Sequence, residues 1–302
     1  MDNMLYVAPL EGLTMAVWRK AHRDVFGGAD KYFAPFISPN QNMSLTEKER
    51  RDITQDEADL VPQVLVSNVE HFAWACETLL ELGYTELNLN FGCPSGTVTA
   101  KRKGSGLLRT PDALDEFLDG AFEVPRGMTI SVKTRIGYED SDRWPEILSV
   151  YEKYPISELI IHPRIRKDFY KGEPDRELFL EAMNESPLKL VYNGDIASPE
   201  DPALSYGCDV MVGRGLIARP SLFREIRGGE PASMDELKRF HDMILEGYME
   251  YMPGELPLLH RMKEFWHYFS ESFDADPKLV RKILKTKKVS EYMNAVNSIF
   301  AG

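Results

Sequence analysis

Three chemically reactive side chains occupy the same kind of place in this sequence, the end of a short apolar run. They are Cys93, Lys133 and His162. A thiol can deliver a proton, a lysine can stabilise negative charge, and an imidazole can donate or accept a hydrogen bond. Because the C-terminal ends of parallel strands meet at one face of a barrel, we expect these side chains to surround one site.

Eight such runs are candidate β-strands, separated by helical segments or polar loops. Most lack the polar alternation of a half-exposed strand, as expected for parallel strands covered on both faces. Eight strands alternating with helices favour a (β/α)8 TIM barrel over a doubly wound sheet. The runs are Leu5–Leu10, Lys31–Phe36, Val61–Val66, Glu86–Phe91, Thr129–Thr134, Glu158–Pro163, Leu188–Tyr192 and Val210–Val212.

Three of the intervening helices can be recognised from their sequences. Val69–Leu82 has apolar residues at helical spacing. Pro111–Phe122 follows Thr110, which is a suitable N-cap before a proline at the first helical position, and Pro199–Ser205 follows Ser198 in the same way.

The C-terminal part of the chain has a different pattern. Residues 227–233 are rich in glycine and proline and indicate a linker, and only helical patterns follow. We therefore expect a barrel domain over residues 1–232 and a small all-helical domain over residues 233–302 that packs on it. The helices expected in the second domain are Met234–Tyr251, Leu256–Phe273, Pro277–Lys285 and Val289–Ile299.

Composition limits the class of protein. The 302 residues include three cysteines and no CxxC pair, which argues against a disulfide framework and favours a reducing compartment. The N-terminus lacks the features of a signal peptide, and no run of about 18 apolar residues occurs. We expect a cytoplasmic protein without a membrane span and without a structural metal.

Charge is unevenly distributed along the chain. The net charge of −12 argues against broad, non-specific binding of nucleic acid. The segment Lys278–Lys288, however, contains six basic residues and no acidic one. A local basic face can therefore exist on an acidic protein.

The ends of the seventh and eighth strands indicate a phosphate site. They read Asn193-Gly194-Asp195 and Gly213-Arg214-Gly215. Glycines allow the backbone to approach a phosphate closely, an arginine adds a charge-assisted contact, and barrels often bind phosphate at these two positions.

Several of these motifs together resemble the tRNA-dihydrouridine synthases. The resemblance covers about residues 5–225, and the helical tail is similar in size and order to the RNA-binding domain of that family. The combination of the NxGCP, VKxRxG and NGD patterns is specific, whereas each pattern alone is weak. The matching segments are Ala8–Gly12, Leu87–Pro94, Gly104–Leu108, Val132–Gly137, His162–Gly172, Tyr192–Asp195 and Val212–Pro220.

The resemblance implies a reaction, a cofactor and a set of residues. The family reduces the C5–C6 double bond of uridines in tRNA with FMN, which NADPH or NADH reduces again, and its members are mostly monomeric. By resemblance, Cys93 is the general acid and Asn90 lies beside the substrate base. The residues expected to bind FMN are Ala8, Pro9, Gln63, Lys133, His162, Asn193, Gly194, Asp195, Gly213 and Arg214.

The implied chemistry suits these residue types. A hydride from flavin N5 to C6 of the uracil leaves C5 in need of a proton, and a thiol with a pKa of about 8.5 is mostly protonated at neutral pH. A lysine such as Lys133 can stabilise negative charge on the reduced flavin near N1 and O2.

An extruded base within tRNA also requires a basic surface for the rest of the RNA. Arg281 and Lys285 are spaced to lie on one helical face. The sixth-strand motif departs from the family, because Pro163-Arg164-Ile165 stands where Gly-Arg-Thr is usual. The expected substrate contacts are Asn90, Lys101, Arg102, Lys103, Arg135, Arg164, Tyr170, Arg281 and Lys285.

Two other functions remain open from the sequence. One is an FMN-dependent reductase or dehydrogenase of small pyrimidines, similar to dihydroorotate dehydrogenase, which would share the barrel and the flavin. The other is a non-catalytic flavin barrel that serves as an RNA chaperone. The sequence does not determine which tRNA uridine is reduced, or whether NADPH or NADH is preferred.

Overall fold

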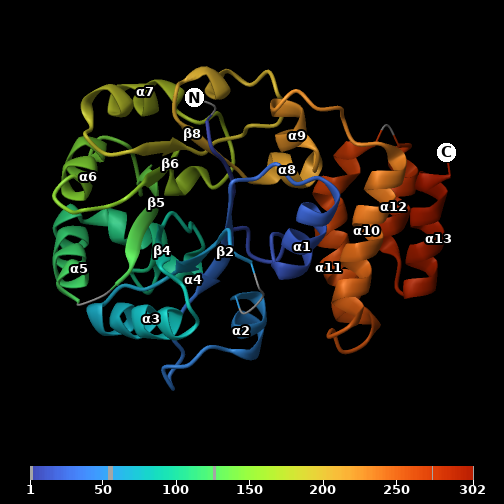
Figure 1. Ribbon diagram of the computed structural model, residues 1–302, viewed down its shortest axis with the longest axis horizontal. Coiled ribbons are helices and arrows are strands. Elements are labelled where there is room, and N and C mark those ends of the chain that lie inside the picture. Colours follow the sequence, from blue (N-terminus) through green and yellow to red (C-terminus); the bar gives the residue numbers. More distant parts are fainter. Residues whose placement is uncertain (1–2, 54–56, 125–126, 274, 302) are drawn as a thin grey trace.

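The chain forms one closed parallel barrel followed by a group of helices. The computed structural model describes residues 3–53, 57–124, 127–273 and 275–301. The eight strands pair in sequence order, and β8 closes the barrel on β1. In Figure 1 helices surround the barrel and the C-terminal helices, in orange and red, stand beside it. The predicted (β/α)8 TIM barrel with C-terminal helices is confirmed.

Each of the eight predicted strands is present, and most of them differ from the prediction at one or both ends. β1 is shorter than predicted because Pro9 has no N–H to donate to a neighbouring strand. β5 and β6 continue beyond their predicted ends and pair Gly137 with Ile165 after a register shift. The strands are β1 Leu5–Val7, β2 Lys31–Ile37, β3 Leu60–Val64, β4 Glu86–Phe91, β5 Thr129–Gly137, β6 Leu159–Ile165, β7 Leu190–Tyr192 and β8 Asp209–Val212.

Side chains fill the interior of the barrel. Near its N-terminal end, the Tyr6 hydroxyl donates to Glu158 Oε1 at 2.8 Å. A packed and closed lower half leaves the C-terminal strand ends as the place for a ligand. The buried interior cluster consists of Tyr6, Ala8, Phe33, Val61, Ile160, Val191 and Met211.

The surrounding helices bury one apolar stripe each against the strands. In α3 the stripe is formed by Phe72, Ala75, Cys76 and Leu79, at helical spacing, and the Asn68 side chain caps the first turn. The helices of this part are α1 Ala16–Val25, α2 Glu47–Ile53, α3 Val69–Glu81, α4 Gly96–Thr99, α5 Pro111–Glu123, α6 Trp144–Tyr151, α7 Arg176–Glu185, α8 Arg214–Ala218 and α9 Leu222–Ile226.

The predicted helix Pro199–Ser205 is wrong in its start and its type. The structure has only a short 3-10 helix, η3 (Pro202–Ser205), and its cap is Asp201, whose Oδ1 accepts the Ala203 N–H at 2.9 Å. Ser198 instead accepts from the Glu200 N–H in a local turn. Two further 3-10 helices are η1 (Gly104–Arg109) and η2 (Arg166–Asp168).

The C-terminal helices share their core with the barrel. Phe240 packs against Trp18 and Phe26 of the α1 region at ring-centroid distances of 5.9 and 5.2 Å. α10 begins with a capping box between Ser233 and Glu236. The domain boundary at 232/233 stays a prediction, and its outer ends at residues 1 and 302 lie outside the described residues. These helices are α10 Met234–Met249, α11 Glu255–Phe269, η4 Ser270–Ser272, α12 Pro277–Lys285 and α13 Val289–Phe300.

Candidate active site

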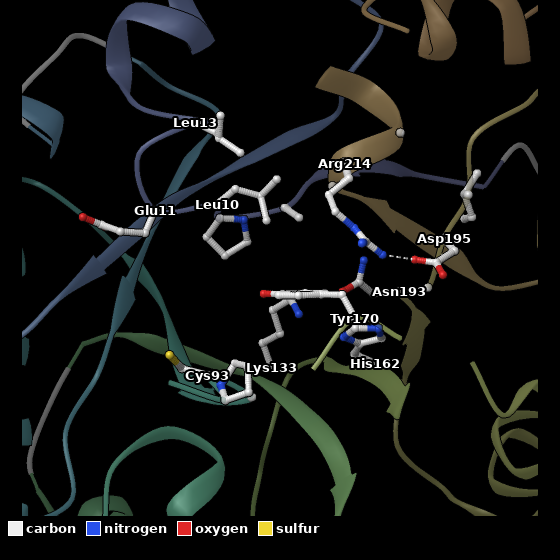
Figure 2. Close-up of a pocket in the computed structure, with 18 of the residues that line it drawn as sticks. Leu10, Glu11, Leu13, Cys93, Lys133, His162, Tyr170, Asn193, Asp195 and Arg214 are labelled. Carbon is white, nitrogen blue, oxygen red and sulfur yellow. Dashed lines mark hydrogen bonds and ion pairs between the residues drawn. The ribbon is translucent and has the colours of Figure 1, made fainter. Parts of the chain in front are cut away.

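A cavity of about 520 Å³ opens at the C-terminal ends of the strands. Figure 2 shows side chains from opposite sides of the barrel, among them Cys93 and Arg214, directed toward one space. A cavity of this size suits a small ligand or cofactor. All ten residues expected to bind FMN border it, namely Ala8, Pro9, Gln63, Lys133, His162, Asn193, Gly194, Asp195, Gly213 and Arg214. Asn90, Cys93, Arg135 and Tyr170 border it as well.

Buried amide side chains form a chain of hydrogen bonds beside the cavity, across β3, β4 and β5. Asn90 Nδ2 donates to Gln63 Oε1 at 2.6 Å, and Gln63 Nε2 donates to Asn88 Oδ1 at 2.8 Å. Asn88 in turn donates to Ser131 Oγ at 3.0 Å. Since each amide fixes the orientation of the next, the orientation of Gln63 at the cavity is set by β4 and β5.

Cys93 lies in a rigid turn directly after β4. Asn90 Oδ1 accepts the backbone N–H groups of Gly92 and Cys93 at 3.0 and 2.9 Å. Ser105 donates its hydroxyl to Cys93 O at 2.8 Å from the opposite side. The Asn90 oxygen and nitrogen both bond to protein groups and help to hold the Cys93 turn, and the predicted place of Asn90 beside the substrate base stays a prediction.

A glycine makes the close packing behind Cys93 possible. Gly104 has a φ of +55°, and a Cβ at this position would lie 2.9 Å from both Cys93 Cβ and Cys93 O. A larger residue would be strained and would displace the thiol. The GSGLL segment that contains Gly104 is thus a support for the Cys93 turn.

The thiol is held in its protonated form. Burial raises the pKa of Cys93, while the Ser95 N–H and the cations Arg135 and Lys133 act in the opposite direction. The net direction is upward, so the thiol carries its proton at neutral pH. A protonated thiol at the cavity wall can act as a general acid.

Lys133 is a cation without a counter-ion. Its ammonium is directed into the cavity (Figure 2), and within the described ranges it has no hydrogen bond or ion pair. Burial, and then the nearby guanidinium of Arg135, lowers the pKa of Lys133 to about 7. Charging this buried amine is costly, so the site favours a ligand with negative charge or strong acceptors.

His162 is neutral and has a defined tautomer. Burial, followed by the cations Lys133 and Arg135, lowers its pKa well below the usual value. Arg164 Nη1 lies 3.0 Å from His162 Nε2, and because a guanidinium can only donate, Nε2 must accept. The proton therefore sits on Nδ1, which has no hydrogen-bond partner within the described residues and is available at the cavity.

Arg164 is buried inside the protein, and its predicted contact with substrate stays a prediction. The side chain is 1% exposed and bonds His162, the Gly172 carbonyl and Asp195. Asp195 also pairs with Arg214 at the cavity edge. Arg164 is buried and ion-paired with Asp195, and it therefore connects β6 to the loop after β7.

Arg135 connects three segments of the chain through hydrogen bonds to backbone carbonyl groups. Its Nε donates to Gly92 O at 3.1 Å, its Nη1 to Ile165 O at 2.7 Å, and its Nη2 to Phe169 O. The side chain is 1% exposed. Arg135 thus joins the Cys93 turn to the loop after β6, and its predicted contact with substrate stays a prediction.

Tyr170 lies across the cavity. Its ring is stacked near His162 at a centroid distance of 6.3 Å, and the Arg214 guanidinium lies 4.8 Å from its centroid. Figure 2 shows the phenol between Arg214 on one side and Lys133 and His162 on the other. Tyr170 is 47% exposed, so a large part of its surface is open to contact with a ligand.

The helical tail supplies a wall that the sequence did not predict. Glu264 and Tyr268 of α11 and Glu271 of η4 border the cavity. Arg261 Nη1 donates to Gly12 O at 2.5 Å and anchors α11 on the loop after β1. The spacing of the three wall residues indicates one helical face, but no local signal tells which face meets the barrel.

The other predicted RNA contacts lie outside this cavity. Lys101 and Arg102 are exposed, whereas Lys103 is partly buried and donates to Ser38 Oγ at 2.7 Å. Arg281 and Lys285 border a separate hollow of about 560 Å³ on α12 and α13. None of these five cations forms an ion pair within the described part of the chain, so their charges are available to a polyanion.

Two classes of feature do not occur in the described ranges. No helix there is long and apolar enough to cross a bilayer. Among the same residues, no group of three or more His, Cys, Asp or Glu side chains could hold a metal ion.

Comparison with known proteins gives one consistent family. The family described as "Dihydrouridine synthase (Dus)" matches residues 6–300. The "Probable tRNA-dihydrouridine synthase 2" of Bacillus subtilis is 29% identical over 299 residues, which cover 94% of this chain and 90% of that protein. The "Probable tRNA-dihydrouridine synthase" of Staphylococcus aureus (strain COL) is 29% identical over 301 residues, with coverages of 94% and 89%.

Solved structures show more distant similarity. The 3-hexulose-6-phosphate synthase of Salmonella typhimurium has a TM-score of 0.47 and 12% identity, covering 81% of this chain and 99% of that chain. A putative dihydrodipicolinate synthase family protein of Coccidioides immitis has the same TM-score and identity, with coverages of 100% and 97%. With TM-scores below 0.5, these similarities say nothing about the reaction.

Proposed function

The chain belongs to the dihydrouridine synthase family, and we propose that it reduces a uridine of tRNA to 5,6-dihydrouridine with bound FMN. One observation carries the proposal. A protonated thiol in a hydrogen-bonded turn, Cys93, borders the same cavity as the Lys133 amine, which has no counter-ion among the described residues. A reduction that adds a hydride and a proton to one double bond needs both an acid and a stabilised electron donor.

The residues around the cavity suit FMN. Lys133 and the Nδ1–H of His162 lack partners in the described structure and can donate to acceptor atoms of the isoalloxazine ring. Arg214 borders the cavity beside the Asn193-Gly194 turn and supplies charge for the phosphate. Since α8 has only five residues, we assign this charge to Arg214 rather than to the helix dipole. We assign FMN binding to Ala8, Pro9, Gln63, Lys133, His162, Asn193, Gly194, Asp195, Gly213 and Arg214.

The proposed chemistry divides between the cofactor and Cys93. FMN, once reduced by NADPH or NADH, supplies the hydride for C6 of the uracil. The Cys93 Sγ–H delivers the proton to C5, and the thiolate that remains regains a proton from solvent. Asn90 holds the Cys93 turn, and Arg135 and Lys133 lie close enough to stabilise the thiolate.

We propose that the tRNA outside the cavity is held by exposed cations of the barrel and the tail. Lys101, Arg102, Arg281 and Lys285 are exposed and have no acidic partner within the described residues. Their contribution is electrostatic and therefore falls as salt rises. We further propose that the protein acts in the cytoplasm as a monomer.

The experiment supplies unmodified tRNA, FMN-loaded protein and NADPH, and measures dihydrouridine by mass spectrometry of the digested RNA. We expect dihydrouridine with the wild type and with C208A, whose thiol lies away from the cavity, and a loss of about 100-fold or more with C93A. No product from FMN-loaded wild type would contradict the proposal. Reduction of free uracil or orotate in place of tRNA would instead support a small-molecule reductase.

A further inference from the structure

Phe169 has an unusual backbone conformation directly before Tyr170, which borders the cavity. It is a large apolar residue with 42% of its surface exposed, and it follows η2 in the loop between β6 and α7. Its φ is +52° and its ψ is −94°. For a bulky residue, a positive φ is an outlier that costs about 1–3 kcal/mol. The exposed ring gains little from burial, so apolar packing does not account for this conformation.

Two arginines hold the Phe169 loop in place. The buried Arg135 donates to the Phe169 carbonyl and, with its other nitrogens, to Ile165 O and Gly92 O. The Arg166 guanidinium lies 4.9 Å from the Phe169 ring centroid, and Arg166 Nε donates to Pro94 O at 3.0 Å. The ring is thus fixed relative to both sides of the Cys93 turn.

The surroundings of the ring suit a nucleic acid. The Arg166 guanidinium lies 5.3 Å from the Tyr138 ring centroid and 4.9 Å from the Phe169 ring centroid. Lys171 is exposed in the same loop, and Tyr170 borders the cavity. Aromatic rings paired with guanidinium groups are surfaces on which unstacked bases stack. The basic charge beside the ring disfavours an apolar protein surface.

We propose that Phe169, supported by Arg166, is a stacking platform for a base of the tRNA next to the uridine that enters the cavity. Extruding one uridine leaves its neighbour without a stacking partner, and a preformed ring at the rim replaces that partner. Arg135 acts as a positioning residue, because it places the platform and the Cys93 turn in one rigid unit. This proposal rests on the proposed function, since it assumes an RNA substrate.

The test uses variants that separate the ring from the backbone. F169G removes the ring and suits the positive φ, so its stability should equal or exceed that of the wild type. F169L keeps an apolar side chain without a flat face, and F169W restores one. L80A is the matched control, because Leu80 is a similarly exposed apolar residue, 39%, on α3. Each FMN-loaded protein is assayed for tRNA affinity and for the rate of dihydrouridine formation.

Loss of one stacked base predicts a reduction of about 5- to 150-fold in tRNA affinity, which is about 1–3 kcal/mol. We expect this loss with F169G and F169L, near wild-type values with F169W and L80A, and unchanged reduction of FMN by NADPH in all variants. Wild-type affinity in F169G, or in F169L, would overturn the proposal. If the wild type itself formed no dihydrouridine, the proposed function would fail instead.

Discussion

Replacing Lys133 with methionine should stabilise the FMN-free protein at acidic pH. The pKa of Lys133 is lowered from 10.5 to about 7, because the ammonium is buried without a partner. At about 1.4 kcal/mol per pKa unit, the charged amine costs up to about 5 kcal/mol. Lys133 is only partly covered, because it borders the open cavity, and water there screens the charge. We therefore treat 5 kcal/mol as an upper limit and expect about 1–3 kcal/mol.

The pH dependence isolates this charge from packing effects. A lysine whose folded pKa is depressed binds fewer protons in the folded state, so wild-type stability rises with pH between about 7 and 10.5. The cost is fully present below pH 7 and is partly lost by pH 9. The advantage of K133M over the wild type should then fall from pH 6 to pH 9 by part of that cost of about 1–3 kcal/mol. Methionine packing is the same at both pH values and cancels in this difference.

The assay is urea unfolding of FMN-free wild type and K133M at both pH values. K153M is the control, because Lys153 is an exposed lysine paired with Asp115 and its replacement should show no such pH dependence. FMN affinity, measured by fluorescence quenching, should fall in K133M although the protein is more stable. A K133M protein that is less stable than the wild type at pH 6, or an advantage that does not change with pH, would refute the reasoning.

Three further predictions follow from particular contacts. R164M should let the pKa of His162 rise and should mix its tautomers, because it removes the one donor to Nε2 found in the described part of the chain. Nitrogen NMR of labelled histidine reports both effects, and the signals should not change in R166M. G104A should lower dihydrouridine formation about 10-fold or more with FMN still bound, because its Cβ displaces Cys93. G207A is the control and should be active, because φ is also positive there, +80°, but no atom lies within 4 Å of an added Cβ. Equal activities of the two variants would contradict the predicted effect of the Gly104 contact. F240A should lower the free energy of unfolding by about 3–5 kcal/mol and still give one unfolding transition, because the barrel and the tail share a core at Trp18 and Phe26. Two separate transitions would show that the two parts have independent cores.

The sequence predicted the barrel because its signals are local. Each strand is a continuous apolar run, and β4 matches its predicted bounds from Glu86 to Phe91. The reactive residues after these runs meet at one cavity because a parallel barrel brings its C-terminal strand ends together. The end of β1 was missed because the limit set by Pro9 depends on pairing with β8.

The sequence could not predict features that arise from contacts between distant residues. Arg164 appeared to be available to RNA, but its partner Asp195 is supplied by the loop after β7. The wall formed by Glu264 and Tyr268 depends on how α11 docks on the barrel, which is fixed by Arg261 at Gly12. Phe169 was not singled out, because neither its positive φ nor its pairing with Arg166 leaves a trace in the sequence.

The most direct test of the account is the anaerobic reoxidation of reduced FMN-loaded protein by unmodified tRNA, followed through the flavin absorbance in a single turnover. If Cys93 supplies the proton while uracil lies between the thiol and the flavin, tRNA should reoxidise the wild type and C208A, and C93A should be slower by about 100-fold or more. Reoxidation of C93A at the wild-type rate would contradict the central claim.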